Sequence, residues 1–190
     1  MKLIKKLLNN WHRYVLCALL SGVFWAWIIL RAVNAPVSQK VQLFADLPYL
    51  ENERLEIALE REKPDGIKYV EAKTFEGLMF DLSVVLQGDL YLIPESKAEE
   101  YLASFAPIDP ADFPGQTFYE SDGKPYGITV FDENAGIRIG DSYVMYIADE
   151  RCFLFFNRDS KHLGAWNGSK DDAAIAIAHN FLKLEREEQP

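Results

Sequence analysis

Cysteine and histidine are scarce in this chain, and their scarcity excludes several classes of protein. Cys17 and Cys152 are the two cysteines, and Cys17 falls inside an apolar run. This distribution excludes a disulfide scaffold, because one cysteine is left for the rest of the chain. The sequence also has neither an HExxH motif nor the paired cysteine spacing of a zinc site. We therefore predict that the protein holds no metal and no cofactor.

Sequence signatures of the common catalytic sites are missing as well. Serine hydrolase, phosphate-binding loop and dinucleotide-binding fingerprints do not occur. The neighbouring carboxylates Asp132-Glu133 and Asp171-Asp172 fall in predicted loops or first helical turns, where solvation and the helix dipole explain them. Cys152 begins the apolar run CFLFF, which predicts a buried, inert thiol rather than a nucleophile. These observations predict that the protein is not an enzyme.

Acidic residues are absent before Asp46, whereas basic residues are present there. The five basic residues up to position 31 are Lys2, Lys5, Lys6, Arg13 and Arg31. The whole chain has 20 Lys and Arg against 29 Asp and Glu, so removing these five leaves 15 against 29, a net charge of −14 for the remainder. A surface of this charge repels phosphate, so we exclude nucleic acid as a partner.

An uncharged apolar run, YVLCALLSGVFWAWIIL, extends from Tyr14 to Leu30. Its length of about 17 residues lies near the lower limit for a helix that crosses the hydrocarbon core. More basic residues precede the run than follow it, which predicts a cytoplasmic N-terminus and a body outside the cell membrane. A cleaved signal peptide is the alternative, with Ala35 closing a small-residue cleavage site. Pro36 directly after that cut, and the length of the run, favour an uncleaved single-pass anchor over residues 1–33.

The remaining chain divides into a linker (34–40), one domain (41–184) and a solvated tail (185–190). Alternating apolar residues predict a strand over 41–45, β-branched and aromatic residues predict one over 67–75, and a continuous apolar run predicts one over 90–93. Helical spacing predicts a first helix that Asp46 and Pro48 open and a second helix over 76–87. A third helix is predicted to begin at Ser96, which has the capping-box spacing with Glu99. Strands that alternate with helices through short connections are typical of an open parallel sheet.

After Asp109 the pattern changes to turns rich in Pro and Gly, followed by further short strands. We expect strands over 127–131, 137–139, 143–148 and 152–156, with a hairpin turn over 148–151 that leads into the last of them. Ser169 is expected to cap a final helix over 171–184.

Several motifs in residues 41–131 occur in the order found in a known family. A Pro-bearing turn into a strand, KPDGIKYV, is followed by LQGDLYLI, by FAPID and by the turn and strand DGKPYG at 122–127. This stretch resembles the first lobe of extracellular solute-binding proteins of family 1, of the type 2 periplasmic-binding-like fold, which serve sugar importers. The resemblance implies an α/β lobe and a ligand held in a cleft between two lobes.

The chain departs from that family after Phe131, where only 59 of its 190 residues remain. That number is too small for a second lobe of ordinary size, so we expect these residues to complete the first lobe. A closed cleft surrounds roughly 70–90% of a small ligand, which a single lobe cannot do. The predicted fold class is therefore α/β, with an N-terminal transmembrane helix followed by a single open-sheet lobe resembling half of a type 2 periplasmic binding protein.

Candidate ligand-binding residues follow the predicted parallel strands, because ligands of such sheets bind at the carboxyl ends of the strands. The candidates by position are Asp46, Tyr49, Phe75, Glu76, Glu95 and Ser96, and the resemblance adds Tyr126 of the DGKPYG motif. The aromatic rings would stack on a sugar face, and the carboxylates would accept hydroxyl hydrogen bonds. The alternative is that the same residues serve as helix caps and packing residues.

Two functions follow from these expectations. The first is a membrane-anchored extracytoplasmic interaction module that docks a membrane or envelope partner, or another copy of itself. The second is a weak binding or sensing protein for a small, saccharide-like solute, associated with an importer. The missing second lobe and the permanent anchor favour the first.

Overall fold

The structure is a computed structural model that describes residues 11–33, 36–75, 85–164, 168 and 171–184, with the backbone alone for residues 12 and 28–33. It separates into two units, Met1–Pro36 and Val37–Pro190. The boundary between these two units falls within the segment predicted as a linker, residues 34–40. Each unit is described by itself below.

The described part of the first unit forms helix α2 (Trp11–Val33), which has 23 residues and encloses the predicted span. Large apolar side chains between Trp11 and Trp27 are more than 40% exposed, among them Leu19, Val23 and Phe24. Among the residues that the structure describes, no helix meets the length and hydropathy needed to cross a membrane. The last three positions of the predicted span, 28–30, lie outside the described side chains.

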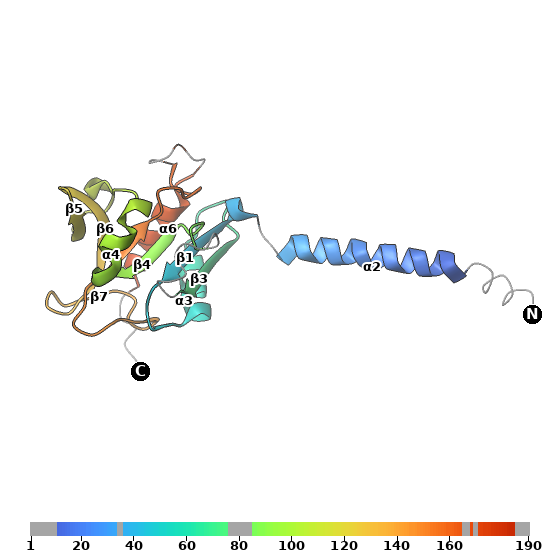
Figure 1. Ribbon diagram of the computed structural model, residues 1–190, viewed down its shortest axis with the longest axis horizontal. Coiled ribbons are helices and arrows are strands. Elements are labelled where there is room, and N and C mark those ends of the chain that lie inside the picture. Colours follow the sequence, from blue (N-terminus) through green and yellow to red (C-terminus); the bar gives the residue numbers. More distant parts are fainter. Residues whose placement is uncertain (1–10, 34–35, 76–84, 165–167, 169–170, 185–190) are drawn as a thin grey trace, which may run out of the picture. The chain divides into compact units, whose positions relative to one another are not determined.

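The second unit is built on a seven-stranded mixed sheet in the order β3-β1-β4-β9-β6-β5, with β7 also paired to β6 (Figure 1). The strands are β1 (Lys40–Ala45), β3 (Tyr69–Thr74), β4 (Leu90–Pro94), β5 (Phe118–Ser121), β6 (Lys124–Asp132), β7 (Ile137–Arg138) and β9 (Cys152–Phe156). β1 pairs in parallel with both β3 and β4, so the three predicted parallel strands are neighbours. This confirms the mixed α/β class with a large open sheet.

Apolar side chains cover both faces of the sheet, and β9 shows this most clearly. Phe153 and Phe155 join an aromatic cluster on one face, while Leu154 and Phe156 join the aliphatic core on the other. All five residues of β9 are buried, which explains its run of apolar residues without polar alternation. The strand is antiparallel to β4 on one side and to β6 on the other.

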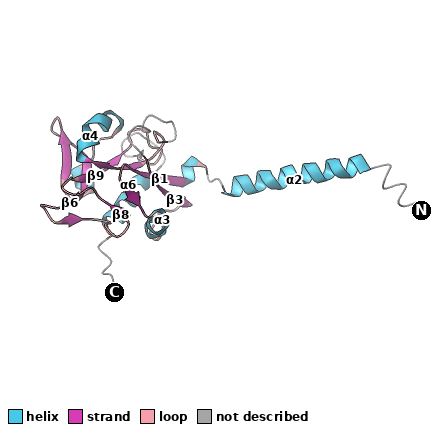
Figure 2. Cartoon of the chain, turned by 60° about the horizontal axis from the view of Figure 1, so that its bottom comes forward, coloured by secondary structure: helices cyan, strands magenta, loops and turns pink. Residues whose placement is uncertain are grey.

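Helices pack on opposite faces of this sheet. α3 (Asn52–Glu60) and α6 (Ala173–Leu182) contribute Leu55, Leu59 and Phe181 to the aliphatic core. α4 (Glu95–Tyr101), continued by the 3-10 turn Leu102–Ser104, contributes Tyr101 to the aromatic cluster. Figure 2 shows α4 on one side of the strands and α3 on the other. The unit therefore has three layers, helix, sheet and helix.

A small second sheet replaces part of two predicted elements. β2 (Tyr49–Leu50) pairs antiparallel with β8 (Val144–Met145). The prediction that a helix begins at Asp46 and Pro48 was wrong, because this segment is extended and α3 begins at Asn52. The predicted strand over 143–148 is reduced to the two residues of β8. The predicted hairpin over 148–151 was also wrong, because β9 inserts between β4 and β6 instead of returning along β8.

The two predicted serine caps have different outcomes. Pro94, not Ser96, occupies the N-cap of α4, and no side-chain cap bond forms there, so this prediction was wrong. Asp172 occupies the N-cap of α6, while Ser169 lies outside the described residues. The predicted helix over 76–87 lies outside them up to residue 84, and its last three residues form a turn.

Candidate functional site

Two carboxylates predicted as ligand acceptors instead pair within the chain. The carboxyl ends of the parallel strands meet at one edge of the sheet, where Asp46 follows β1 and Glu95 follows β4. Asp46 is buried, and its Oδ2 accepts a hydrogen bond of 2.8 Å from Lys97 Nζ. Glu95 forms a two-point ion pair with Arg151, which includes a 2.8 Å bond from Nε. The hydroxyl-binding role predicted for these side chains therefore competes with an existing salt bridge in each case.

Ser96 also makes its bond within the chain, through its backbone. Its N–H donates to Oε1 of Glu150, 54 residues later, at 2.8 Å. The Arg151 guanidinium that pairs with Glu95 lies 5.4 Å from the centre of the Phe153 ring. Residues 150–151, which precede β9, thus tie the start of α4 to the sheet.

The predicted aromatic candidates differ in their exposure. Phe75 is buried against Phe44 and Tyr91, with ring centres 6.2 and 6.4 Å away. Tyr126 is half-buried on the same aromatic cluster. Tyr49 is 53% exposed. Phe75 and Tyr126 therefore pack as the alternative interpretation predicted, whereas Tyr49 keeps an accessible ring.

Glu76 lies outside the described residues. Of the six candidates that the structure describes, Tyr49 lines a cavity at the carboxyl edge of the sheet. This cavity is an open groove of about 430 Å³, which we call the β8 groove. Its described wall comprises Tyr49, Phe131, Glu133, Arg138 and residues 141–146 with Ala148.

The rim of the β8 groove is apolar and exposed. Tyr49 of β2 stands opposite Met145 of β8 in the strand pairing, and Met145 is 58% exposed. Leu50 and Val144, the neighbouring pair, are buried beneath them. Two-residue alternation therefore places one apolar pair in the core and the other at the surface. This is the opposite of the usual preference for a polar outer face.

Polar groups in the wall of the β8 groove are held by local contacts. Arg138 pairs with Glu133 at 2.8 Å and lies 5.5 Å from the centre of the Phe131 ring. Phe131 stacks on Tyr146, with ring centres 4.6 Å apart. The Tyr146 hydroxyl donates to the carbonyl of Ile139 at 2.5 Å, and burial together with the nearby Cys152 and Asp141 raises the pKa of Tyr146 well above its ordinary value. The tyrosine therefore stays neutral and structural.

Sequence reasoning missed most of this groove. Residues 143–148 were predicted to form an ordinary strand, and the exposed Met145 within them was not identified as a site residue. The available signal was an apolar residue at a position where a surface strand usually carries a polar one.

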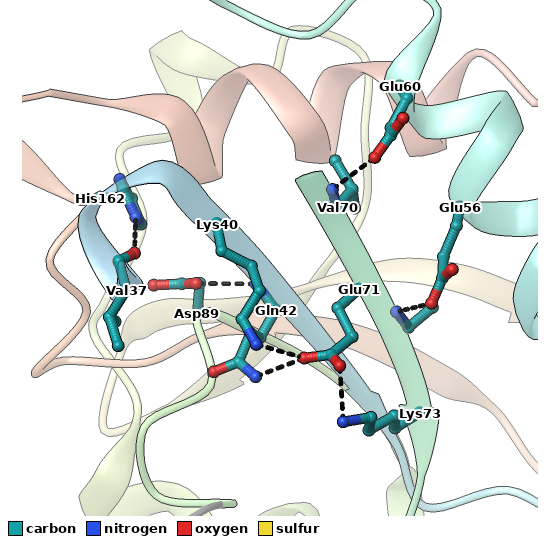
Figure 3. A network of polar contacts seen from close by, with 11 residues as sticks. Val37, Lys40, Gln42, Glu56, Glu60, Val70, Glu71, Lys73, Asp89 and His162 are labelled. Atoms are coloured by element: carbon teal, nitrogen blue, oxygen red, sulfur yellow. Dashed lines mark hydrogen bonds and ion pairs between the residues drawn. The ribbon is translucent and has the colours of Figure 1, made fainter. Parts of the chain in front are cut away.

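A buried polar cluster occupies the amino end of the parallel strands, away from the predicted site (Figure 3). Asp89 accepts hydrogen bonds from the Gln42 N–H at 2.8 Å and from the Ser160 hydroxyl at 2.5 Å. Burial raises the pKa of Asp89, although these two bonds oppose the rise. His162 is fully buried beside them, and its Nδ1 lies 2.8 Å from Asp171 Oδ1.

This cluster is not arranged as a nucleophile with its base. His162 Nε2 lies 3.0 Å from the carbonyl oxygen of Val37, whereas the Ser160 hydroxyl bonds to Asp89. A serine nucleophile requires its hydroxyl to bond to the imidazole. Within the described residues, no group of three or more His, Cys, Asp and Glu side chains is placed to hold a metal ion. Cys152 is buried, and burial raises the pKa of its thiol, as an inert cysteine requires.

A second cavity, of about 290 Å³, lies near the same amino end. Its wall includes Phe113, Phe156, Leu163 and Ile175, with the exposed carboxylates of Asp109 and Asp112 among its lining residues. Phe156 ends β9 and pairs with Leu90, the first residue of β4. This cavity is therefore separate from the carboxyl edge where the ligand site was predicted.

Comparison of the chain with protein-family models, with curated proteins and with solved structures returned no match. The resemblance to solute-binding proteins stays a prediction from sequence motifs.

Proposed function

We propose that this protein is a membrane-tethered, extracytoplasmic interaction module whose β8 groove docks a protein partner. The observation that carries the proposal is the exposed pair of Tyr49 and Met145 beside an open groove. Aromatic residues and methionine are enriched at protein interfaces relative to the rest of the protein surface. This edge therefore has the composition of a contact surface.

The negative net charge of the domain indicates which kind of partner would bind it. The part of the chain after Arg31 has a net charge of −14. A partner segment with apolar side chains for the groove and basic residues around them would complement this surface, because opposite potentials steer association. The proposed partner is thus an envelope or membrane protein that presents an apolar segment flanked by lysine or arginine.

A small, saccharide-like solute is the second candidate, and the size of the groove favours it. A volume of about 430 Å³ falls within the roughly 300–1,000 Å³ typical of ligand pockets. Tyr49 would offer its exposed ring for stacking. The ion pairs of Asp46 and Glu95 weigh against this candidate, because they occupy the carboxylates expected to bind hydroxyl groups. A solute held on one side only would bind weakly.

The proposed tether is the apolar run from Tyr14 to Leu30, within a single lobe-plus-anchor architecture resembling half of a solute-binding protein. Support comes from the exposed apolar side chains of α2 and from the basic residues that precede the run. With this topology, a reporter enzyme fused after Pro190 is active only outside the cell membrane. Activity in the cytoplasm would overturn the proposed orientation.

Site-specific photocrosslinking in native membranes tests the docking surface. A photoreactive amino acid replaces Met145 in the groove or, as a control, Ile57, which is 61% exposed on α3. The proposal predicts a discrete crosslinked product at position 145 and none at position 57. Equal labelling at both positions, or none at either, would contradict it. A thermal-shift screen with saccharides tests the second candidate, which requires stabilisation by at least one of them.

A further inference from the structure

His162 lies between two hydrogen-bond acceptors, and this arrangement fixes its protonation state. Nδ1 lies 2.8 Å from the carboxylate of Asp171, and Nε2 lies 3.0 Å from the carbonyl oxygen of Val37. The Val37 oxygen is a carbonyl, which only accepts, and Asp171 Oδ1 already acts as an acceptor, from the Ala173 N–H at 3.2 Å. A neutral imidazole carries one N–H and can satisfy one of the two. Both contacts therefore require the imidazolium ion.

The charges around the ring favour that ion. Asp171 faces it from the segment before α6, and Asp89 faces it from the start of β4. From the side of the 3-10 turn Val37–Gln39, the facing group is the Val37 carbonyl, which does not titrate. Burial by itself would lower the pKa of His162, but the hydrogen bonds to Asp171 and Val37 and the two carboxylate charges raise it above its ordinary value.

The two acceptors belong to segments far apart in the sequence. Val37 is the first residue of the second unit and begins the 3-10 turn Val37–Gln39, which leads into β1. Asp171 precedes α6, and its Oδ1 also accepts from the Ala173 N–H at 3.2 Å. Figure 3 shows the imidazole directed at the Val37 carbonyl, beside the Asp89 carboxylate. The histidine thus joins the entry of the chain into the domain to the segment that leads into the last helix.

We propose that His162 is a pH-dependent clamp, which holds Val37 to the domain while the ring is doubly protonated and releases it when one proton is lost. On deprotonation one ring nitrogen presents a lone pair to an oxygen, so one of the two contacts is repelled. The Val37 contact is the weaker one, because its acceptor is a neutral carbonyl. The turn Val37–Gln39, which leads into β1, is therefore held less firmly at high pH than at low pH.

The protonation state can be measured on the unaltered chain. We expect ¹⁵N NMR of the full chain in detergent micelles, with histidine ring nitrogens labelled, to show both nitrogens of His162 protonated at pH 6.5. The titration midpoint is expected above the ordinary histidine value of about 6.5. The His162→Gln variant assigns the signal by its loss. A neutral ring at pH 6.5, or a midpoint below that value, would overturn the proposal.

Hydrogen exchange of the full chain tests the release. After correction for the intrinsic pH dependence of exchange, the amides of residues 37–42 should exchange roughly tenfold faster above the titration midpoint than below it, the factor expected for one lost charge-assisted bond. Amides of β9 serve as the internal reference. The His179→Gln variant should keep the effect, because His179 stacks on Phe113 elsewhere in the domain.

The Asp171→Asn variant separates a clamp from a merely structural histidine. Asparagine keeps an acceptor oxygen but removes the charge, so the midpoint of His162 and the pH of the exchange transition should both move down together. Movement of one without the other would refute the coupling between protonation and release. The same exchange profile in residues 37–42 and in β9 at every pH would also refute it.

Discussion

Two glutamates of α3 cap the edge of the sheet, and removing them should destabilise the domain. β3 is paired with β1 on one side. On its other side, the N–H of Val70 donates to Glu60 Oε1 and that of Ala72 to Glu56 Oε1, both at 2.9 Å (Figure 3). The one-turn spacing of the two glutamates matches the two-residue spacing of outward N–H groups along a strand.

The magnitude follows from the exposure of these bonds. A hydrogen bond to a charged group contributes about 1.5–3 kcal/mol when buried, and both glutamates are half-exposed, so we take about 1 kcal/mol for each. The double variant Glu56→Ala with Glu60→Ala should therefore lose about 2 kcal/mol of unfolding free energy. With a urea slope of about 2 kcal/mol/M, the unfolding midpoint falls by about 1 M.

Urea unfolding of the full chain in detergent, followed by circular dichroism, measures this change. The double variant Glu56→Gln with Glu60→Gln keeps both acceptor oxygens, so it should lose about half as much unfolding free energy. The Glu53→Ala variant changes an exposed position of the same helix and should leave the unfolding free energy almost unchanged. Sedimentation velocity should also detect self-association of the double alanine variant, because its bare edge can pair with another copy. An unchanged midpoint in the double alanine variant, or equal losses in the alanine and glutamine variants, would refute the capping role.

Two further predictions concern acid stability and packing. Burial alone would raise the pKa of Glu71, but hydrogen bonds from Lys40, Lys73 and Gln42 lower it from 4.5 to about 2, so its stabilising contribution is present above pH 4.5 and is lost as the pH falls toward 2. After a discount for the exposure of Glu71, the loss of unfolding free energy is about 1–2 kcal/mol. The urea midpoint should therefore fall less between pH 5 and pH 3 in the Glu71→Gln variant than in the unaltered protein. An identical fall in both proteins would contradict this role of Glu71. A Cβ at Gly127 would lie 2.7 Å from the Phe155 ring, so Gly127→Ala should lower the unfolding free energy by about 1–3 kcal/mol; an unchanged thermal midpoint would show that the ring can move aside.

The parallel core was predictable because its signals are local. β1 and β3 carry β-branched and aromatic residues next to turns, β4 is an apolar run, and the Gly88-Asp89 break before β4 marks its start. Gly88 is needed there, since a Cβ would lie 2.5 Å from the Phe44 ring. The parallel pairing of these strands was expected from their alternation with helices. The sequence patterns therefore predicted the part of the fold that depends on residues close together in the sequence.

Non-local pairing caused the errors. Leu47 and Leu50 are buried apolar residues with a spacing that a helix would also produce, but the segment is extended and its Leu50 pairs with Val144. Glu51 then donates its N–H to the Tyr143 carbonyl at 2.8 Å. The partner of this segment lies more than 90 residues later, so no local pattern distinguishes the two outcomes.

The same limit applied to the candidate site. Asp46 and Glu95 were placed at the correct edge, but their partners, Lys97 and Arg151, come from segments 51 and 56 residues away. Sequence position alone could not show that these carboxylates are already paired. Tyr49 remains a candidate binding residue because its ring is exposed and lines the β8 groove.

The path of the chain after β6 decides how much of a ligand this domain can enclose. β6 is antiparallel to β9, which is antiparallel to β4, so β6 runs in the direction of the parallel strands and ends at the same edge. The chain then passes through β7 and β8 and returns as β9 through the middle of the sheet. Residues 152–156 therefore complete the sheet of this domain, and without them β4 and β6 would lose their shared partner. A molecule bound at the carboxyl edge consequently contacts this domain on one side, and tight binding there requires a second protein surface on the other.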